Sequence, residues 1–231
     1  MIKAVFFDLY NTLIHYEPPP EEQQTQACRA FGIEVERQAI RHGYWAANEF
    51  LTHENARLAI QKRSEEEQRE FWIDWEATLL RKAGVNVSRE LASQILDWVR
   101  QTDRKLVLYP DVLPTLTLLR SRGLTLGLIS NLERSLEHLC TDLGLSPYLD
   151  FILISHEVGF EKPHPEIFLT ALERAKVQAS EAIHVGDQYH ADVVGARQVG
   201  IKPLLLDRDG LFADFTDCER IQSLEEIMRY I

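Results

Sequence analysis

The chain has 231 residues, enough for one large domain or for a core domain with a smaller companion, and its 45% hydrophobic and 26% charged residues are ordinary for a globular protein. A formal net charge of −11 argues against non-specific nucleic-acid binding, which requires basic patches. The sequence opens with neither a basic segment nor a long apolar one, so we expect no signal peptide and no membrane span.

Three widely spaced cysteines, Cys28, Cys140 and Cys218, form no metal-ligand pattern. An odd number of unpatterned cysteines is typical of reduced thiols that serve as small packing residues. We therefore expect an intracellular, cytoplasmic protein.

After Lys3 the chain has an apolar run over residues 4–7 with β-branched and aromatic side chains, which predicts a buried strand ending at Asp8. Burying a lone carboxylate is costly, so Asp8 needs a cation, hydrogen bonds or a catalytic task. A turn-capping role for Asp8 is the simpler alternative. Asn11 and Thr12 suit the turn that would follow.

The next convincing strand covers residues 124–130, whereas a loop from strand to helix usually takes about 2–6 residues. Most of the intervening segment, from about residue 21 to 103, has helical patterns, including a capping box at residues 64–67. We expect a helical cap domain over residues 16–105, inserted into a core formed by residues 1–15 and 106–231. The alternative is that these helices pack on a single core.

Strands and helices alternate after residue 110. Asp111 can cap a helix that ends at Gly123, and a capping box at residues 223–226 opens a last helix. Between them we expect strand 124–130, helix 133–143, strand 151–155, helix 165–175, strand 182–186, helix 191–199 and strand 203–207. Such alternation predicts an α/β fold, a parallel sheet with helices on both faces.

Polar residues stand where three of these strands end: Asp8, then Ser130 with Asn131, then Gly186 with Asp187. In open α/β sheets, ligands bind beyond the carboxyl ends of the strands. The sequence therefore predicts a site at this edge, under the proposed cap.

These stretches resemble the motifs of the haloacid dehalogenase-like superfamily, a group of aspartate-nucleophile hydrolases with a Rossmann-like core. The matches, in the order the family has them, are Asp8-Leu9-Tyr10-Asn11-Thr12-Leu13, Ser130-Asn131, Lys162-Pro163-His164-Pro165 and Gly186-Asp187-Gln188-Tyr189-His190-Ala191-Asp192. The helical insert resembles the subgroup with the small helical, C1-type cap.

The resemblance implies that Asp8 is the nucleophile, since a carboxylate can form a covalent ester that water later cleaves. Ser130 and Asn131 would bind substrate oxygens, although a serine at a strand end is also unremarkable. Lys162 would offer a point charge to a phosphoryl oxygen and balance Asp8, whereas a lone lysine is normally solvated.

Asp8 and Asp187 at adjacent strand ends would concentrate negative charge in a poorly solvated place. Mg²⁺ relieves such repulsion, because it takes hard oxygen ligands and needs only one or two carboxylates plus substrate phosphate. The resemblance implies Asp8, the Tyr10 carbonyl and Asp187 as ligands, with Asp192 in support. Asp192 could also simply cap the following helix.

Tyr10 departs from the phosphatases that this pattern resembles, which carry a second aspartate there as general acid. Tyrosine, with a pKa of about 10, is poorly matched to that role at neutral pH. Tyrosine at this position resembles 2-haloacid dehalogenases, which lack the metal site and have Ser-x-Asn where this chain has Gly186 and Asp187.

We give the carboxylate cluster more weight, because it suits Mg²⁺ and would hinder attack on an anionic haloacid. The sequence thus predicts a Mg²⁺-dependent phosphohydrolase that acts on a small phosphorylated metabolite through an aspartyl-phosphate. The alternatives are a 2-haloacid dehalogenase and a slow family member that binds a phosphate ligand. We expect no nucleic-acid or membrane partner, and a monomer or homodimer.

Overall fold

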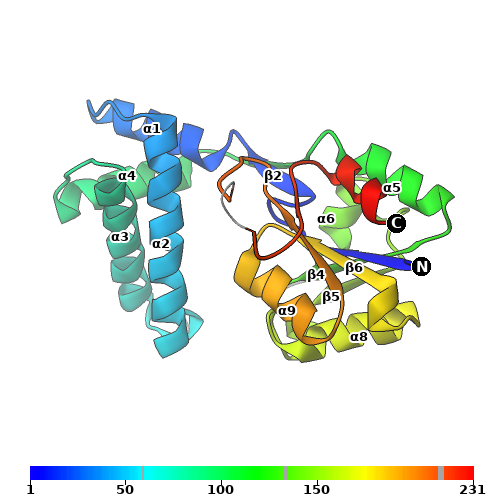
Figure 1. The fold of residues 1–231 in the computed structure, drawn as a ribbon. Coiled ribbons are helices and arrows are strands. Elements are labelled where there is room, and N and C mark those ends of the chain that lie inside the picture. Colours follow the sequence, from blue (N-terminus) through cyan, green and yellow to red (C-terminus); the bar gives the residue numbers. More distant parts are fainter. Residues whose placement is uncertain (59, 133–134, 213–215) are drawn as a thin grey trace. The chain divides into compact units, whose positions relative to one another are not determined.

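The computed structural model describes residues 1–58, 60–132, 135–212 and 216–231, shown as a ribbon in Figure 1. Contacts within the chain divide it into two compact units. One unit joins Met1–His15 to Leu106–Ile231, and the other is Tyr16–Lys105.

The first unit is built on a six-stranded sheet with strand order β5-β4-β1-β6-β7-β8. Every pair of neighbouring strands in it is parallel. The strands are β1 (Ala4–Phe7), β4 (Thr125–Ser130), β5 (Phe151–Ile154), β6 (Ala182–Gly186), β7 (Lys202–Leu206) and β8 (Arg220–Ile221). The predicted parallel α/β sheet is confirmed.

Helices cover both faces of this sheet (Figure 1). In β1, Val5 and Phe7 belong to the core shared with α5, α6 and the C-terminal helix, whereas Ala4 and Phe6 belong to the core shared with α8 and α9. This alternation follows from the two-residue period of a strand. The helices are α5 (Val112–Ser121), α6 (Glu137–Asp142), α7 (Ser155–Val158), α8 (Pro165–Ala175), a 3₁₀ turn (Ala179–Glu181), a π-helical turn (Tyr189–Val194), α9 (Gly195–Gln198) and a C-terminal 3₁₀ helix (Leu224–Tyr230).

Three helix-start predictions need correction. Asp111 precedes α5 but makes no side-chain cap, because its carboxylate binds Arg208 and the start of the C-terminal helix instead. The C-terminal helix is of the 3₁₀ type and lacks the predicted capping box, since the Glu226 carboxylate accepts from the Gln222 amide. α6 begins only at Glu137, and residues 133–134 of the predicted helix lie outside the described residues.

The strand order places a switch point at the middle of the sheet. From β1 the chain adds β4 and β5 on one side and then crosses to β6, β7 and β8 on the other. Phe7 pairs with Val185, so Asp8, directly after β1, and Gly186, the last residue of β6, lie at the same edge of two neighbouring parallel strands. Such a switch point is where ligands bind in open α/β sheets.

The second unit packs four helices around its own apolar core, which includes Ile40, Leu79 and Ile95. The predicted capping box is present, with the Glu67 amide donating to Ser64 Oγ and the Ser64 amide donating to the Glu67 carboxylate. The helices are α1 (Pro20–Ala30), α2 (Arg37–Arg57), α3 (Glu65–Lys82) and α4 (Arg89–Gln101), with a 3₁₀ turn at Ile60–Lys62.

Two short strands, β2 (Ile14–Glu17) and β3 (Lys105–Leu108), pair with each other where the chain passes between the units. Each of these strands has only four residues, and a pattern that short does not predict a strand. None of the helices in the described ranges has the length and apolar character needed to cross a membrane.

Candidate active site

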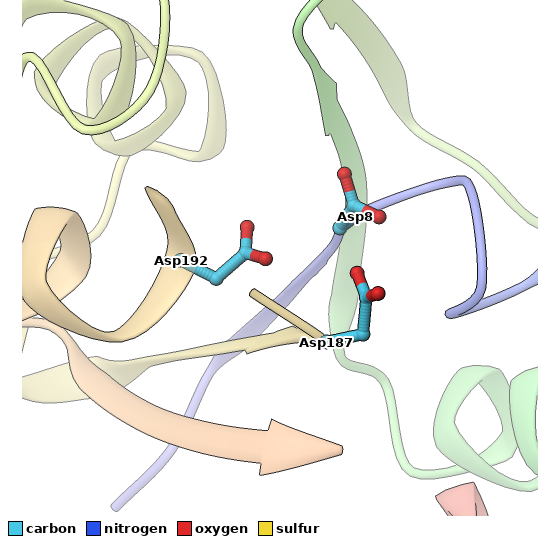
Figure 2. Close-up of side chains that lie close together, drawn as sticks. All are labelled: Asp8, Asp187 and Asp192. Atoms are coloured by element: carbon cyan, nitrogen blue, oxygen red, sulfur yellow. The ribbon is translucent and has the colours of Figure 1, made fainter. Parts of the chain in front are cut away.

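Three carboxylates meet at the switch point. Asp8 follows β1, Asp187 follows β6 and Asp192 lies in the π-helical turn, and Figure 2 shows their side chains gathered around one region. One oxygen from each lies within 4.8 Å of the others. The parallel register brings the two strand ends together, and the turn after β6 returns Asp192 toward them.

Lys162 supplies the positive charge of this cluster. Its Nζ donates to Asp8 Oδ1 at 2.6 Å and to Asp192 Oδ1 at 2.7 Å, and its side chain is only 2% exposed. Burial would lower the pKa of Lys162, but the carboxylates of Asp192 and Asp8 raise it above its usual value. The lysine is therefore charged and bridges two acidic side chains.

Asp192 accepts hydrogen bonds on both oxygens. Oδ1 lies 2.9 Å from His184 Nε2 as well as close to Lys162, and Oδ2 accepts from the Gln188 amide at 3.0 Å. Burial would raise the pKa of Asp192, but the Lys162 ammonium and the His184 ring reverse the effect and hold that pKa below its usual range. Asp192 is thus a fixed anion.

Gly186 makes room for this arrangement. A Cβ atom at this position would lie 2.1 Å from Asp192 Cγ, far inside van der Waals contact. Any other residue at the end of β6 would therefore displace Asp192.

Of the three carboxylates, Asp187 is the one for which no ion pair is found within the described residues. Its Oδ2 accepts from Asn11 Nδ2 at 3.2 Å, whereas Oδ1 is buried and has no hydrogen-bond partner among the described residues. Burial and then the negative charges of Asp8 and Asp192 hold the pKa of Asp187 well above its usual range. Asn11 reaches Asp187 from a backbone with φ +59°, which asparagine tolerates better than most residues.

The pKa of Asp8 is also above its usual value. Burial is the main cause, the Lys162 ammonium opposes it, and the Asp192 carboxylate adds to it. With all groups ionised, the three carboxylates and one ammonium leave two uncompensated negative charges, which a divalent cation would balance. The orphan oxygen of Asp187 and this charge excess both fit a hard metal ion.

The other predicted residues lie around this cluster. Ser130 ends β4, the neighbour of β1, and is 2% exposed. Asn131 holds the backbone of Lys162 at two points, because its Oδ1 accepts from the Lys162 amide at 2.7 Å and its Nδ2 donates to the Lys162 carbonyl at 2.9 Å. Tyr10 is partly buried against the apolar core. Substrate binding by Ser130 and Asn131 and metal binding by the Tyr10 carbonyl stay predictions.

The family model of haloacid dehalogenase-like hydrolases matches residues 2–200 of the chain. The chain belongs to this hydrolase family. The resemblance predicted from the four motifs is thereby confirmed.

The chain is also similar in sequence to individual members of the family. The chain is 31% identical over 220 residues to human haloacid dehalogenase-like hydrolase domain-containing protein 3, covering 89% of this chain and 82% of that protein. It is also 31% identical over 215 residues to a glyceraldehyde 3-phosphate phosphatase of Methanopyrus kandleri, covering 90% and 85%.

Two solved structures resemble this member of the family over 99% of its chain and 97% of theirs. One is a HAD phosphatase from Thermococcus onnurineus, at 27% identity and a TM-score of 0.58. The other is a 2-haloacid dehalogenase from Pseudomonas syringae, at 27% identity and a TM-score of 0.56. Overall similarity therefore does not choose between the two chemistries, and the choice depends on the side chains of the site.

His184, which was not among the predicted site residues, is fully buried and faces Asp192. Its signal was a single polar residue inside the apolar strand Ala182–Gly186, two positions before Gly186. In the helical unit we find Trp45 59% exposed on α2.

Proposed function

We propose that this hydrolase is a Mg²⁺-dependent phosphohydrolase that acts on a small phosphorylated compound. The observation that carries the proposal is Asp187 Oδ1, a buried carboxylate oxygen for which the described part of the chain offers no hydrogen-bond partner, close to Asp8 in a cluster of excess negative charge. A relative named as a phosphatase of a small phosphorylated aldehyde supports the substrate class.

Asp8 and Asp187 would hold the cation together with the Tyr10 carbonyl. Both oxygens of Asp192 already accept hydrogen bonds, which supports an indirect role for Asp192, acting through Lys162. When bound, Mg²⁺ supplies positive charge to the oxygens of a transferring phosphoryl group.

The reaction would start with attack by the free oxygen of Asp8 on phosphorus. A bond forms between Asp8 and phosphorus, the bond from phosphorus to the leaving oxygen breaks, and an aspartyl-phosphate results. Water then attacks this phosphorus, which releases inorganic phosphate and restores the carboxylate. Lys162 would keep Asp8 oriented and balance charge on the phosphoryl oxygens.

Tyr10 places a limit on the substrate. With tyrosine two residues after Asp8, the leaving group receives no proton from a carboxylic acid at that position. We therefore expect acyl and aryl phosphates, whose leaving groups are stable anions, to react faster than sugar phosphates.

We further propose that the helical unit, Tyr16–Lys105, is the cap that selects the substrate. Arg41 of α2 is held by Glu21, with 2.7 Å between Nη2 and Oε1, and the exposed Trp45 lies one helical turn further along the same helix. These are the first positions to vary in a substrate screen.

The test is release of phosphate from p-nitrophenyl phosphate and acetyl phosphate, with Mg²⁺ and with EDTA, by wild type and Asp8→Asn. We expect Mg²⁺-dependent release that the variant loses. Tyr10 and the similar dehalogenase structure favour the second candidate, a 2-haloacid dehalogenase, so chloride release from 2-chloropropionate is measured in parallel. Metal-independent chloride release without phosphate release would overturn the proposal.

A further inference from the structure

A second charged cluster lies behind the loop that follows Asp8. The Arg208 guanidinium, just after β7, donates to both oxygens of Asp111, from Nη1 at 2.9 Å and from Nη2 at 3.0 Å. The same Nη2 donates to the Thr12 carbonyl at 2.9 Å. The guanidinium also stacks on Tyr109, with Cζ 3.9 Å from the ring centroid.

Asp111 is fixed from its other side as well. Its Oδ2 accepts from Ser223 Oγ and from the Leu224 amide, each at 2.9 Å. Burial would raise the pKa of Asp111, but Arg208 and the Leu224 amide lower it below its usual value. The side chains of Arg208 and Asp111 are only 16% and 13% exposed, so the pair is a rigid, well-shielded anchor.

The anchor reaches the loop between Asp8 and β2 at two consecutive carbonyls. Arg208 binds the Thr12 carbonyl, and the Tyr109 amide donates to the Leu13 carbonyl at 3.1 Å. Within the loop, the amides of Leu13 and Ile14 both donate to the Leu9 carbonyl. Hydrogen bonds within the loop therefore hold its two ends together, and hydrogen bonds from Arg208 and Tyr109 fix its C-terminal end.

One residue between Asp8 and the two anchored carbonyls contacts the acidic cluster. Asn11, directly before Thr12, donates its side-chain amide to Asp187 Oδ2. A shift of the Thr12 carbonyl would therefore move Asn11 away from Asp187 and loosen the backbone that carries Asp8 and Tyr10.

We propose that Arg208 is a positioning residue, which with Asp111 holds the Asp8 loop so that Asn11 and Asp8 keep their places around the cation site. The catalytic consequence rests on the proposed function. The guanidinium suits this task because its planar fork serves the two oxygens of Asp111 and the Thr12 carbonyl together, whereas a lysine ammonium is a single point donor.

The test compares Arg208→Lys and Asp111→Asn with Arg120→Lys. Arg120 forms a similar pair with Asp150 in the same unit, at 2.6 Å, but contacts neither Thr12 nor Asp111. Three experiments are done at a temperature where circular dichroism shows every variant folded: calorimetry for the Mg²⁺ dissociation constant, kinetics for kcat and KM with p-nitrophenyl phosphate, and amide hydrogen exchange.

We expect Arg208→Lys and Asp111→Asn each to weaken Mg²⁺ binding and lower kcat about 10–100-fold, the range for residues that orient metal ligands, while KM changes less. The amides of Leu13 and Ile14 should exchange faster than in wild type, while exchange in the six-stranded sheet stays unchanged. The double variant should lose little more than either single variant, because both break one anchor. Arg120→Lys should behave as wild type.

The proposal is overturned if Arg208→Lys keeps wild-type Mg²⁺ affinity and kcat, or if exchange rises uniformly along the chain, as a purely stabilising role would produce. A wild type that neither binds Mg²⁺ nor releases phosphate would instead defeat the proposed function. The exchange of Leu13 and Ile14 then still decides whether Arg208 holds the loop.

Discussion

Lys162 and Asp192 form an ion pair in the interior of the first unit, with 2.7 Å between Nζ and Oδ1 and side chains 2% and 1% exposed. Water screens such a pair very little, so each charge depends on the other. Because Lys162 also binds Asp8, the proposed nucleophile, this one ammonium links Asp8 to Asp192, which His184 and the Gln188 amide hold in place.

Replacing Lys162 by Met should remove activity and also destabilise the fold. The change leaves Asp8 and Asp192 buried together without their cation, and breaking a buried pair in this way costs about 3–5 kcal/mol. Urea unfolding of the variant measures the loss, with Lys82→Met on the exposed end of α3 as control. A loss below about 1 kcal/mol would contradict the buried pair.

Gly186→Ala should disturb the site without changing any charge. The new Cβ would meet Asp192 Cγ at 2.1 Å, and Asp192 cannot yield without breaking its bonds to Lys162, His184 and the Gln188 amide. Overpacking of this kind costs about 1–3 kcal/mol, and we expect kcat to fall at least about tenfold. Thermal unfolding and phosphatase kinetics check both effects; wild-type values for the two would show that the strand end adjusts freely.

Tyr10→Asp should make the enzyme hydrolyse substrates with poor leaving groups faster. A carboxylic acid at this position could donate the proton that an alkoxide needs, an effect worth about 10²–10⁴ in rate. We expect kcat/KM to rise for a sugar phosphate and to change little for p-nitrophenyl phosphate. Tyr10→Asn, which removes the ring without adding an acid, is the matched control; an equal gain in both variants would point to space instead of proton donation.

Glu76 should make the stability of the helical unit depend on pH. It is fully buried in α3, its Oε1 accepts from Gln24 Nε2, and its Oε2 has no partner among the residues described. Burial raises the pKa of Glu76 to about 7 from 4.5, although Gln24 and the charge of Arg100 oppose the rise. Tyr44 and Cys28 lie close to the same carboxyl group and have raised pKa values themselves.

Because the folded state binds this proton more tightly than the unfolded state, its stabilising effect is complete below pH 4.5 and is lost as the pH rises through about 7. Between pH 5 and pH 8 the loss should be about 2.5 kcal/mol. All 4 tryptophans lie in the helical unit, at positions 45, 72, 75 and 98, so their fluorescence follows its unfolding. Glu76→Gln should flatten the pH dependence relative to wild type, and equal slopes would contradict the raised pKa.

The sequence by itself determined the alternation of strands and helices, the family, and the acidic residues at the ends of β1 and β6. Each of these rests on a local pattern: an apolar run that stops at a charge, a capping box at Ser64, or a glycine that ends a helix. The parallel orientation of the strands then follows from the general rules for connections between strands and helices, so Asp8 and Asp187 could be expected at the same edge of the sheet.

Only the tertiary structure decided which side chains meet. Arg208 and Asp111 are 97 residues apart, and Asn131 and Lys162 are 31 apart, and no local pattern marks either pair. A short-range rule predicts that Asp111 caps a helix, but its carboxylate binds Arg208 and the Leu224 amide, which are far away in the sequence. His184 looked like an ordinary strand residue because its hydrogen bond to Asp192 arises only when the turn after β6 folds back. Long-range pairing of this kind depends on packing of the whole unit, and therefore cannot be derived from the order of neighbouring residues.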